Sequence, residues 1–373
     1  MIAFNNAVVF TGEQFIPDHA VLIENGLITD VVHSKDIPAD ADVHNINGKI
    51  LAPAFLDLQI YGGNGKLFSY ELNNESLIAT DDYCAKGGCT RFLITMATNS
   101  LEKMLKGIEV VKSFQQTHQS GLLGLHLEGP YINAEKRGAH LKQYIHQPSV
   151  DEVQLLLDKA DGVLKMMTVA PEQCSDEVLQ LLADNGVVLS AGHTNATYQQ
   201  ATESFNKTIT AATHLFNAMS PLQSRAPGVV GAVYDHTTVN SSVVCDGIHT
   251  DFAAISISKK IMHERLFLIT DAVPEIQSGE YQHLFQGDRF VLPDGTLSGS
   301  ALTMIKAVTN CIDKVGIDAA EAMRMASGYP ARVIQKQNRF GKIEKGFKAD
   351  LLVLSNGYQV EKVMRDGRFI FYS

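Results

Sequence analysis

The middle of the chain alternates short apolar runs with segments of helical periodicity, and this alternation restricts the fold more than any other feature. After Ser100, for example, apolar residues recur at helical spacing at Leu101, Met104, Leu105 and Ile108. The apolar runs are "AFLDLQI", "RFLITMAT", "LLGLHLEG", "VLKMMTVAP", "GVVLSAGHT", "TITAATHLF", "SVVCDGIHT" and "RLFLITDAV". About eight strands that alternate with helices predict an α/β protein with a closed (β/α)8 TIM-like barrel.

A doubly wound open sheet is the alternative for such a pattern. It would predict a glycine-rich phosphate loop directly after the first strand. The stretch "YGGNGK" at 61–66 contains glycines, but it lacks the Walker spacing and the final Lys-Ser or Lys-Thr pair. The barrel is therefore the preferred interpretation.

Both ends of the chain have a different sequence pattern, in which short apolar runs are joined by tight turns. Asn25-Gly26 divides "VLIENGLITDVV", and Asp366-Gly367 divides "VMRDGRFIF". These dipeptides favour the positive φ angles of two-residue hairpin turns. We expect one small β-sandwich domain formed by the N- and C-terminal segments, residues 1–51 plus 341–373. The barrel, residues 52–340, is then inserted between them, which is feasible because domain termini often lie close together.

Composition restricts the partners and the compartment. The net charge is −10, from 31 Lys and Arg against 41 Asp and Glu, without a long basic block. This argues against nucleic acid or an anionic membrane as a partner, and leaves an anionic small molecule held by a few local cations. Five scattered cysteines argue against a disulfide framework and a four-thiolate zinc site. The start has no signal-peptide pattern, and no apolar run approaches the roughly 20 residues of a membrane span. We expect a soluble, cytoplasmic protein.

Polar residues stand where several predicted strands end, and in parallel barrels the chemistry lies at those ends. The third, fifth and sixth runs end in Glu128, His193 and His214. A buried carboxylate costs several kcal/mol unless it is paired, so Glu128 is predicted to share a divalent cation with the two imidazoles. A lone histidine is more often a hydrogen-bonded core residue, but three groups at corresponding strand ends favour a metal site. This donor set suits zinc, and iron, cobalt or nickel also fit.

Other polar residues near these strand ends allow two interpretations. Asp271, in "LITDAV", is either a cap for the next segment or a general base, and its place at the eighth strand end favours the base. His126 lies two residues before Glu128 on the same strand face, so we expect it deeper, in the core or beside the ligands. Histidines in helical or loop contexts, His283 among them, are expected to be structural.

Five motifs carry a resemblance to a known family. They are "HLEGP" at 126–130, "GHTNA" at 192–196, "THLFNAM" at 213–219, "DGIHT" at 246–250 and "TDA" at 270–272. In this order they resemble the N-acetylglucosamine-6-phosphate deacetylases of the amidohydrolase superfamily. The resemblance runs from "LAPAFLDLQ" to "GKIEKGFKADLLVL", essentially the whole chain.

The resemblance implies a reaction and a set of functional residues. The reaction is hydrolysis of the acetamide of N-acetyl-D-glucosamine 6-phosphate to D-glucosamine 6-phosphate and acetate, in a homodimer. The metal ligands are again Glu128, His193 and His214, with Asp271 as catalytic acid and base. The implied substrate-binding residues are Ala139, His140, Asn217, Ala218, Arg225, His249 and Leu302. A guanidinium forks onto a phosphate, which suits the arginine to the sugar-phosphate side.

One departure from the superfamily pattern concerns the first strand. Many amidohydrolases end this strand with His-x-His, whereas this chain has Gln59 and Tyr61 in "DLQIYGG". Neither neutral side chain replaces an imidazole ligand well, so we expect one metal ion per subunit, with Gln59 at most a hydrogen-bonding neighbour. Two alternatives stay open: another amidohydrolase reaction, on a cyclic amide or an N-acetylated amino acid, and a binding or regulatory barrel without catalysis. The second would not need all three ligands and Asp271.

Overall fold

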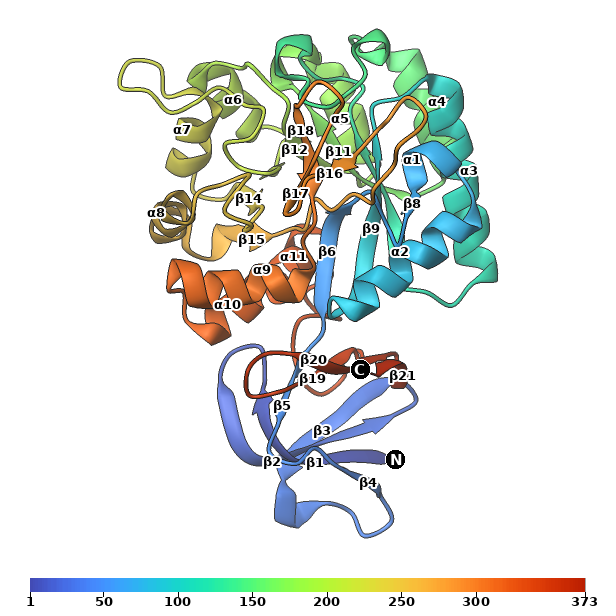
Figure 1. Cartoon of the computed structure of the whole chain (residues 1–373), viewed down its shortest axis with the longest axis vertical. Coiled ribbons are helices and arrows are strands. Elements are labelled where there is room, and N and C mark those ends of the chain that lie inside the picture. The colour runs from blue at the N-terminus through green and yellow to red at the C-terminus, as the bar shows by residue number, and fades with distance from the viewer. Residues whose placement is uncertain (373) are drawn as a thin grey trace. The chain divides into compact units, whose positions relative to one another are not determined.

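The computed structural model describes residues 1–372, and the chain divides into two compact units (Figure 1). One unit contains residues 1–57, 83–91 and the segment from 303 onward, and the other contains residues 58–82 and 92–302. The predicted domain bounds, 1–51 plus 341–373 and 52–340, stay a prediction. Among the described residues, helices that are both long and apolar enough to cross a membrane are absent.

The barrel sheet has eight parallel strands that follow one another in chain order. Its strands are β6 (Phe55–Ile60), β9 (Cys89–Ala97), β10 (Leu122–Glu128), β11 (Leu164–Val169), β12 (Val188–Ala191), β13 (Ala211–Ala212), β14 (Asn240–Val243) and β15 (Leu266–Leu268). A parallel bridge from Ile60 to Ala272 brings the first strand to the segment after the last, so the ring nearly closes. The predicted barrel is confirmed, and each of the eight predicted runs contains or adjoins one of these strands.

The sequences of the strands are nearly continuous apolar runs, because in a parallel sheet of this kind both faces are covered by other parts of the protein. Every residue of β9 is buried, for example. The helices are α1 (Phe68–Glu71), α2 (Asn74–Lys86), α3 (Leu101–Thr117), α4 (Val150–Ala160), α5 (Asp176–Asp184), α6 (Tyr198–Phe205), α7 (Gly228–Asp235) and α8 (Phe252–Met262). Neighbouring helices pack pairwise: α3 with α4, α4 with α5, α6 with α7 and α7 with α8. Ser149 accepts a hydrogen bond from the backbone N–H of Glu152, which caps the start of α4.

A short antiparallel sheet follows β15 and was not expected. It contains β16 (Leu284–Phe285), β17 (Arg289–Val291) and β18 (Leu297–Ser300). The stretch "VLPDGTLSG" holds a Pro-Asp-Gly turn signal at 293–295 between two of these strands. A second small hairpin, β7 (Gly62–Gly63) with β8 (Lys66–Leu67), follows β6. Both lie among the loops that line the candidate site.

The terminal segments form one mixed sheet in the order β21-β20-β19-β5-β1-β2-β3, with β4 beside β1. The strands are β1 (Ile2–Phe10), β2 (Phe15–Glu24), β3 (Leu27–His33), β4 (Asp42–Asn45), β5 (Ile50–Pro53), β19 (Leu351–Leu354), β20 (Val360–Arg365) and β21 (Arg368–Tyr372). Both predicted hairpins are present, with positive φ at Asn25, Gly26, Asp366 and Gly367. The small domain from both chain ends is confirmed, as a single mixed sheet. The same unit holds α9 (Met304–Asn310), α10 (Ala319–Ala326) and α11 (Gly328–Val333).

A buried ion pair joins distant segments of this first unit. Arg91 donates to Asp350 through Nε at 2.6 Å and through Nη2 at 3.1 Å, and both side chains are at most 10% exposed. The backbone N–H of Asp366 donates to Asp350 Oδ1 at 2.8 Å, and the Thr90 hydroxyl donates to Oδ2 at 3.1 Å. This carboxylate therefore connects the start of β9 with the turn between β20 and β21.

Removing the charge of Asp350 should destabilise the protein. We expect Asp350→Asn to lower the free energy of unfolding by about 1.5–3 kcal/mol, because it removes a charged hydrogen-bond acceptor and leaves Arg91 with only the partly exposed Asp366 as its ion-pair partner. Urea unfolding followed by circular dichroism measures this change. Glu109→Gln, in an exposed pair with Lys106, is the control and should unfold close to wild type. A wild-type urea midpoint for Asp350→Asn would contradict the assignment.

Candidate active site

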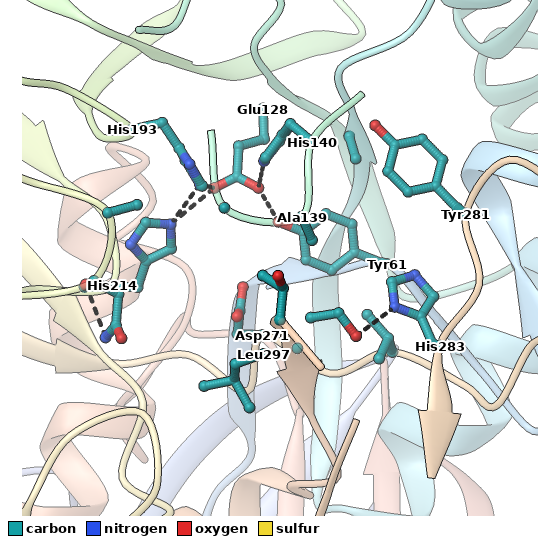
Figure 2. A pocket seen from close by; sticks show the side chains of 18 of the residues that line it. Tyr61, Glu128, Ala139, His140, His193, His214, Asp271, Tyr281, His283 and Leu297 are labelled. Carbon is teal, nitrogen blue, oxygen red and sulfur yellow. Dashed lines mark hydrogen bonds and ion pairs between the residues drawn. The ribbon is translucent and has the colours of Figure 1, made fainter. Parts of the chain in front are cut away.

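A cavity of about 350 Å³ lies at the C-terminal ends of the barrel strands (Figure 2). Nine of the predicted site residues line it: Glu128, Ala139, His140, His193, His214, Asn217, Ala218, His249 and Asp271. They come from different strand ends and from the loop after β10. The barrel therefore brings together residues that lie up to 143 positions apart in the sequence, from Glu128 to Asp271.

Glu128 is the centre of the site, and only 1% of it is exposed. Its Oε1 atom lies 3.0 Å from His214 Nε2, 3.4 Å from His193 Nε2 and 2.9 Å from Gln59 Nε2. Its Oε2 atom lies 3.2 Å from His140 Nε2. Burial alone would raise the pKa of Glu128, but His193 and the other two imidazoles hold it well below its usual value. The group is therefore an ionised carboxylate in the interior of the protein.

Four non-glycine residues of the site have left-handed backbone conformations: φ is 47° at His193, 33° at His214, 50° at Ala218 and 56° at Asp271. Such angles are uncommon for bulky residues and persist only where the surroundings enforce them. The N–H of His214 donates to Ser242 Oγ at 2.8 Å, and the N–H of Asp271 donates to the Gln59 carbonyl at 2.9 Å. Tertiary contacts thus hold each strand end in the conformation that the site requires.

Hydrogen bonds to the second ring nitrogen indicate the tautomers of two histidines. His193 Nδ1 lies 2.9 Å from the Lys136 carbonyl and donates its hydrogen there, so Nε2 is the ring nitrogen that faces Glu128 and His214. His140 Nδ1 accepts from the Thr98 backbone N–H at 3.2 Å, so its hydrogen is on Nε2. Burial lowers the pKa of His140 to about 4, which keeps the ring neutral. In this state His140 donates a hydrogen bond to Glu128, whereas Nε2 of His193 is the nitrogen that a cation could bind.

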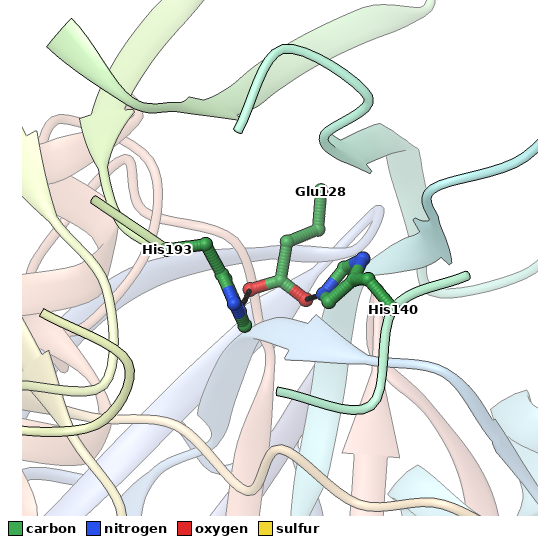
Figure 3. A group of neighbouring side chains, drawn as sticks. All are labelled: Glu128, His140 and His193. Atoms are coloured by element: carbon green, nitrogen blue, oxygen red, sulfur yellow. Dashed lines mark ion pairs between the residues drawn. The ribbon is translucent and has the colours of Figure 1, made fainter. Parts of the chain in front are cut away.

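The donor atoms suit a divalent cation, and they form two overlapping sets. Glu128, His140 and His193 offer ligand atoms that all lie within 4.8 Å of one another (Figure 3). His214 Nε2 lies 3.0 Å from Glu128 Oε1 and 3.1 Å from His193 Nε2, so it completes a second, tighter set. Carboxylate oxygen with imidazole nitrogen is the chemistry of catalytic zinc and related metals. The structure therefore supports a metal site of the predicted kind without selecting the metal.

Gln59 links the two carboxylates of the site. Its Nε2 atom donates to Glu128 Oε1 and to Asp271 Oδ1, both at 2.9 Å. The Thr213 hydroxyl donates to its amide oxygen, which fixes the orientation of the amide. Burial raises the pKa of Asp271, and the negative charge of Glu128 adds to this effect, while His214 opposes it. Asp271 is thus a buried carboxylate with a raised proton affinity beside the cluster.

His249 and His126 differ in their relation to the cavity. His249 lines the cavity. Its Nδ1 atom donates to Asp246 Oδ2 at 2.6 Å, so Nε2 is the ring nitrogen that this hydrogen bond does not use. His126 is fully buried behind the site, with Nδ1 3.0 Å from the Leu58 carbonyl and Nε2 2.8 Å from Thr168 Oγ1. Its place agrees with the expectation of a position deeper in the barrel.

Two of the predicted substrate-binding residues do not line the cavity. Arg225 is exposed on the loop between β13 and α7, and Leu302 is buried just after β18. Their proposed contacts with the substrate therefore stay predictions, and the arginine would need a second subunit or a moved loop to reach the cavity.

Several lining residues were missed by sequence reasoning, among them Tyr61, Lys136, Tyr281, His283 and Ser298. His283, which we expected to be structural, is 4% exposed in the cavity wall, with Nδ1 3.0 Å from Ser298 Oγ. Tyr281 donates to the Thr98 carbonyl at 2.5 Å. Tyr281, His283 and Ser298 belong to the segment that forms the small sheet after β15, whose local signal in the sequence is the Pro-Asp-Gly turn. Tyr61 donates to Glu128 Oε2 from the position of the second histidine in His-x-His.

The barrel and its buried carboxylate–imidazole cluster define the class of protein. They are typical of the amidohydrolases, and the model of the amidohydrolase family matches residues 50–370. The model of the NagA composite domain matches residues 1–51. The prediction of an amidohydrolase enzyme is confirmed.

Full-length relatives narrow the class to one family. N-acetylglucosamine-6-phosphate deacetylase of Haemophilus influenzae is 34% identical over 378 residues, 98% of each chain. The crystal structure of N-acetylglucosamine-6-phosphate deacetylase from Pasteurella multocida matches with a TM-score of 0.95 at 32% identity, over 100% of both chains. A variant of the Mycobacterium smegmatis enzyme in complex with N-acetyl-D-glucosamine-6-phosphate matches with a TM-score of 0.90 at 27% identity, over 99% of this chain and 98% of that one. The chain belongs to the N-acetylglucosamine-6-phosphate deacetylase family.

Proposed function

We propose that the protein hydrolyses the acetamide of N-acetyl-D-glucosamine 6-phosphate to D-glucosamine 6-phosphate and acetate, as a step in amino-sugar breakdown. The observation that carries this proposal is the cluster of Glu128, His193 and His214 at the strand ends, with Asp271 at the same cavity. Membership of the family supports the choice of substrate, as does the Mycobacterium smegmatis relative, whose structure contains this phosphorylated sugar.

The proposed ligands of a single divalent cation are Glu128 Oε1, His193 Nε2 and His214 Nε2, which lie 3.0 to 3.4 Å apart. Zinc is the first candidate, and iron, cobalt or nickel suit the same donors. When bound, the cation supplies Lewis acidity: it polarises the acetamide carbonyl and lowers the pKa of a nearby water. Gln59 and Tyr61 donate hydrogen bonds to Glu128, so the end of the first strand supports a ligand rather than a second metal.

Asp271 and His140 perform the remaining steps in this proposal. Asp271 takes the proton of the attacking water and delivers it to the departing amine nitrogen. Its raised pKa makes it a better proton acceptor than an exposed aspartate. His140 carries its hydrogen on Nε2 and lines the cavity, so it can donate to the oxygen that becomes negative in the tetrahedral state.

We assign the sugar phosphate to the part of the cavity lined by Asn217 and Ala218. Ala139 and His249, which also line the cavity, are proposed to contact the rest of the substrate. We propose that Arg225 binds the phosphate across the interface of a homodimer, because it is exposed and lies outside the cavity of its own subunit. An exposed apolar side chain on the same loop supports such an interface: Leu222 is 53% exposed.

Arg225→Ala should weaken catalysis only toward phosphorylated substrate. We expect kcat/KM for N-acetylglucosamine 6-phosphate to fall about 10- to 100-fold, because a hydrogen-bonded charge pair contributes about 1.5–3 kcal/mol. Hydrolysis of unphosphorylated N-acetylglucosamine, already slow, should not change. Steady-state kinetics on both substrates measures the difference, and an equal loss on both would contradict phosphate binding.

Mixing two variants with reduced activity tests whether the arginine acts across subunits. When Arg225→Ala and Asp271→Asn proteins are unfolded together and refolded, mixed dimers would hold one intact site, with Asp271 from one subunit and Arg225 from the other. We expect deacetylase activity to reappear. If the arginine serves its own subunit instead, mixing restores nothing while size-exclusion chromatography still shows dimers.

The decisive test of the reaction is acetate release by metal-replete protein. N-acetylglucosamine 6-phosphate should be hydrolysed, whereas a cyclic amide such as a hydantoin and an N-acetylated amino acid should not. Removal of metal by a chelator should stop the reaction, and added zinc should restore it. Folded, metal-containing protein that releases no acetate from the phosphorylated sugar would refute the proposal.

A further inference from the structure

The end of β11 contributes nothing to the cavity wall: none of residues 164–175 lines it in the part of the chain that the structure describes. Yet a carboxylate, Glu172, stands three residues after this strand, in the short turn Pro171–Gln173. It accepts three hydrogen bonds from other loops. The Thr194 hydroxyl donates to Oε2 at 2.5 Å, and the Asn195 N–H and Asn133 Nδ2 donate to Oε1 at 2.7 and 2.9 Å.

The three donors lie on the two loops that carry key residues of the site. Thr194 and Asn195 directly follow His193. Asn133 lies at the start of the loop that leads to His140, and its N–H donates to the His193 carbonyl at 2.8 Å. One carboxylate therefore holds the loop after β12 to the loop after β10.

The hydrogen bonds to Glu172 can stabilise a strained backbone conformation at His193. His193 has a φ of 47° and would leave this conformation if its surroundings did not hold it. Hydrogen bonds to an ionised carboxylate are roughly twice as strong as neutral ones. Three of them at the residues that flank His193 are well placed to offset the strain and to fix the direction of its ring.

We propose that Glu172 is a positioning residue of the site: its carboxylate clamps the loops after β10 and β12 together and so sets where His193 and His140 lie. Glu172 itself does not touch the cavity. The clamp is present in the protein alone, but its consequence for catalysis rests on the proposed function, in which His193 is a metal ligand and His140 a hydrogen-bond donor.

Glu172→Gln tests the clamp, because the amide keeps the length of the side chain but replaces one acceptor oxygen by a donor. The full-length, metal-free protein is measured first by hydrogen–deuterium exchange. We expect faster exchange confined to residues 131–141 and 192–197, with unchanged exchange in the helices α3 and α8. Glu177→Gln, an exposed carboxylate in the first turn of α5, is the matched control and should exchange like wild type.

Zinc affinity and kinetics supply the second measurement. Competition with a chromophoric chelator should show zinc bound about 10- to 100-fold more weakly by Glu172→Gln, the usual cost of losing a partner behind a ligand. At saturating zinc, kcat should fall while KM changes little, and the visible spectrum of the cobalt-loaded protein should shift. Thr194→Val removes one of the three hydrogen bonds without altering shape, so it should give a smaller version of each effect even if Glu172→Gln folds poorly.

The outcomes separate this inference from the proposed function. Wild-type protein that binds no zinc and releases no acetate would refute the metal site, whatever the variants show. Wild-type protein that does both, with Glu172→Gln unchanged in exchange, affinity and kcat, would overturn the clamp. Faster exchange spread over the whole chain would also overturn it, because Glu172 would then act on general stability. The double variant Glu172→Gln/Thr194→Val should lose little more zinc affinity than Glu172→Gln alone, since both changes remove the same hydrogen bond.

Discussion

Asp271→Asn should reduce kcat about 10²- to 10⁴-fold, which is the contribution expected of a positioned general base. The asparagine keeps the size of the side chain, and its amide oxygen can still accept the hydrogen bond that Gln59 Nε2 makes to Asp271 Oδ1. The geometry of the site should therefore survive, while the group that we propose takes the proton from water is lost. Metal content and the affinity for phosphorylated sugar should stay near wild type.

Rapid-quench measurement of acetate, together with calorimetric titration of the sugar, separates chemistry from binding in this variant. Asp158→Asn, an exposed aspartate of α4, is the control for a change of one charge. A variant at position 271 that retains most of its kcat would exclude the base role. Loss of metal along with activity would instead make Asp271 part of the support of the cluster.

The strand-end residues could be anticipated because the barrel fixes where strand ends meet. Glu128, His193, His214 and Asp271 each follow an apolar run, and parallel strands place such residues on one rim. The left-handed conformations of three of them could not be anticipated. They depend on hydrogen bonds from other strands, such as that from the His214 N–H to Ser242.

Residues that reach the site by loops or small insertions were harder to predict. His283 and Ser298 belong to segments whose two- to four-residue strands give too short a pattern for periodicity to detect. Glu172 follows an apolar run as Glu128 does, yet its side chain points to neighbouring loops and not into the cavity. Spacing along a strand cannot distinguish these two directions, since they are decided by the turn that follows.

Substitutions of His140 and His214 should also have large effects, and they distinguish the two possible sets of metal ligands. The structure offers Glu128 and His193 with either His140 or His214. His140 accepts a backbone N–H on Nδ1, which leaves the hydrogen on Nε2, and a protonated nitrogen cannot bind a metal. Within residues 1–372, His214 Nδ1 has no hydrogen-bond partner, so this nitrogen can carry the ring hydrogen when a cation takes the lone pair of Nε2. These hydrogen positions favour His214 as the third ligand.

We therefore expect His214→Asn to lose stoichiometric metal and, with it, all measurable deacetylation. His140→Asn should keep its metal but lose about 10²- to 10³-fold in kcat, the usual effect of removing one donor to a developing oxyanion. Metal analysis after dialysis and kinetics at saturating zinc measure the two effects, with His146→Asn, which lies outside the cavity wall, as control. The reverse result, with metal lost from His140→Asn and kept by His214→Asn, would assign the site to Glu128, His140 and His193. The Thr98 N–H would then have to release His140 Nδ1 when the metal binds, and the oxyanion would need another donor.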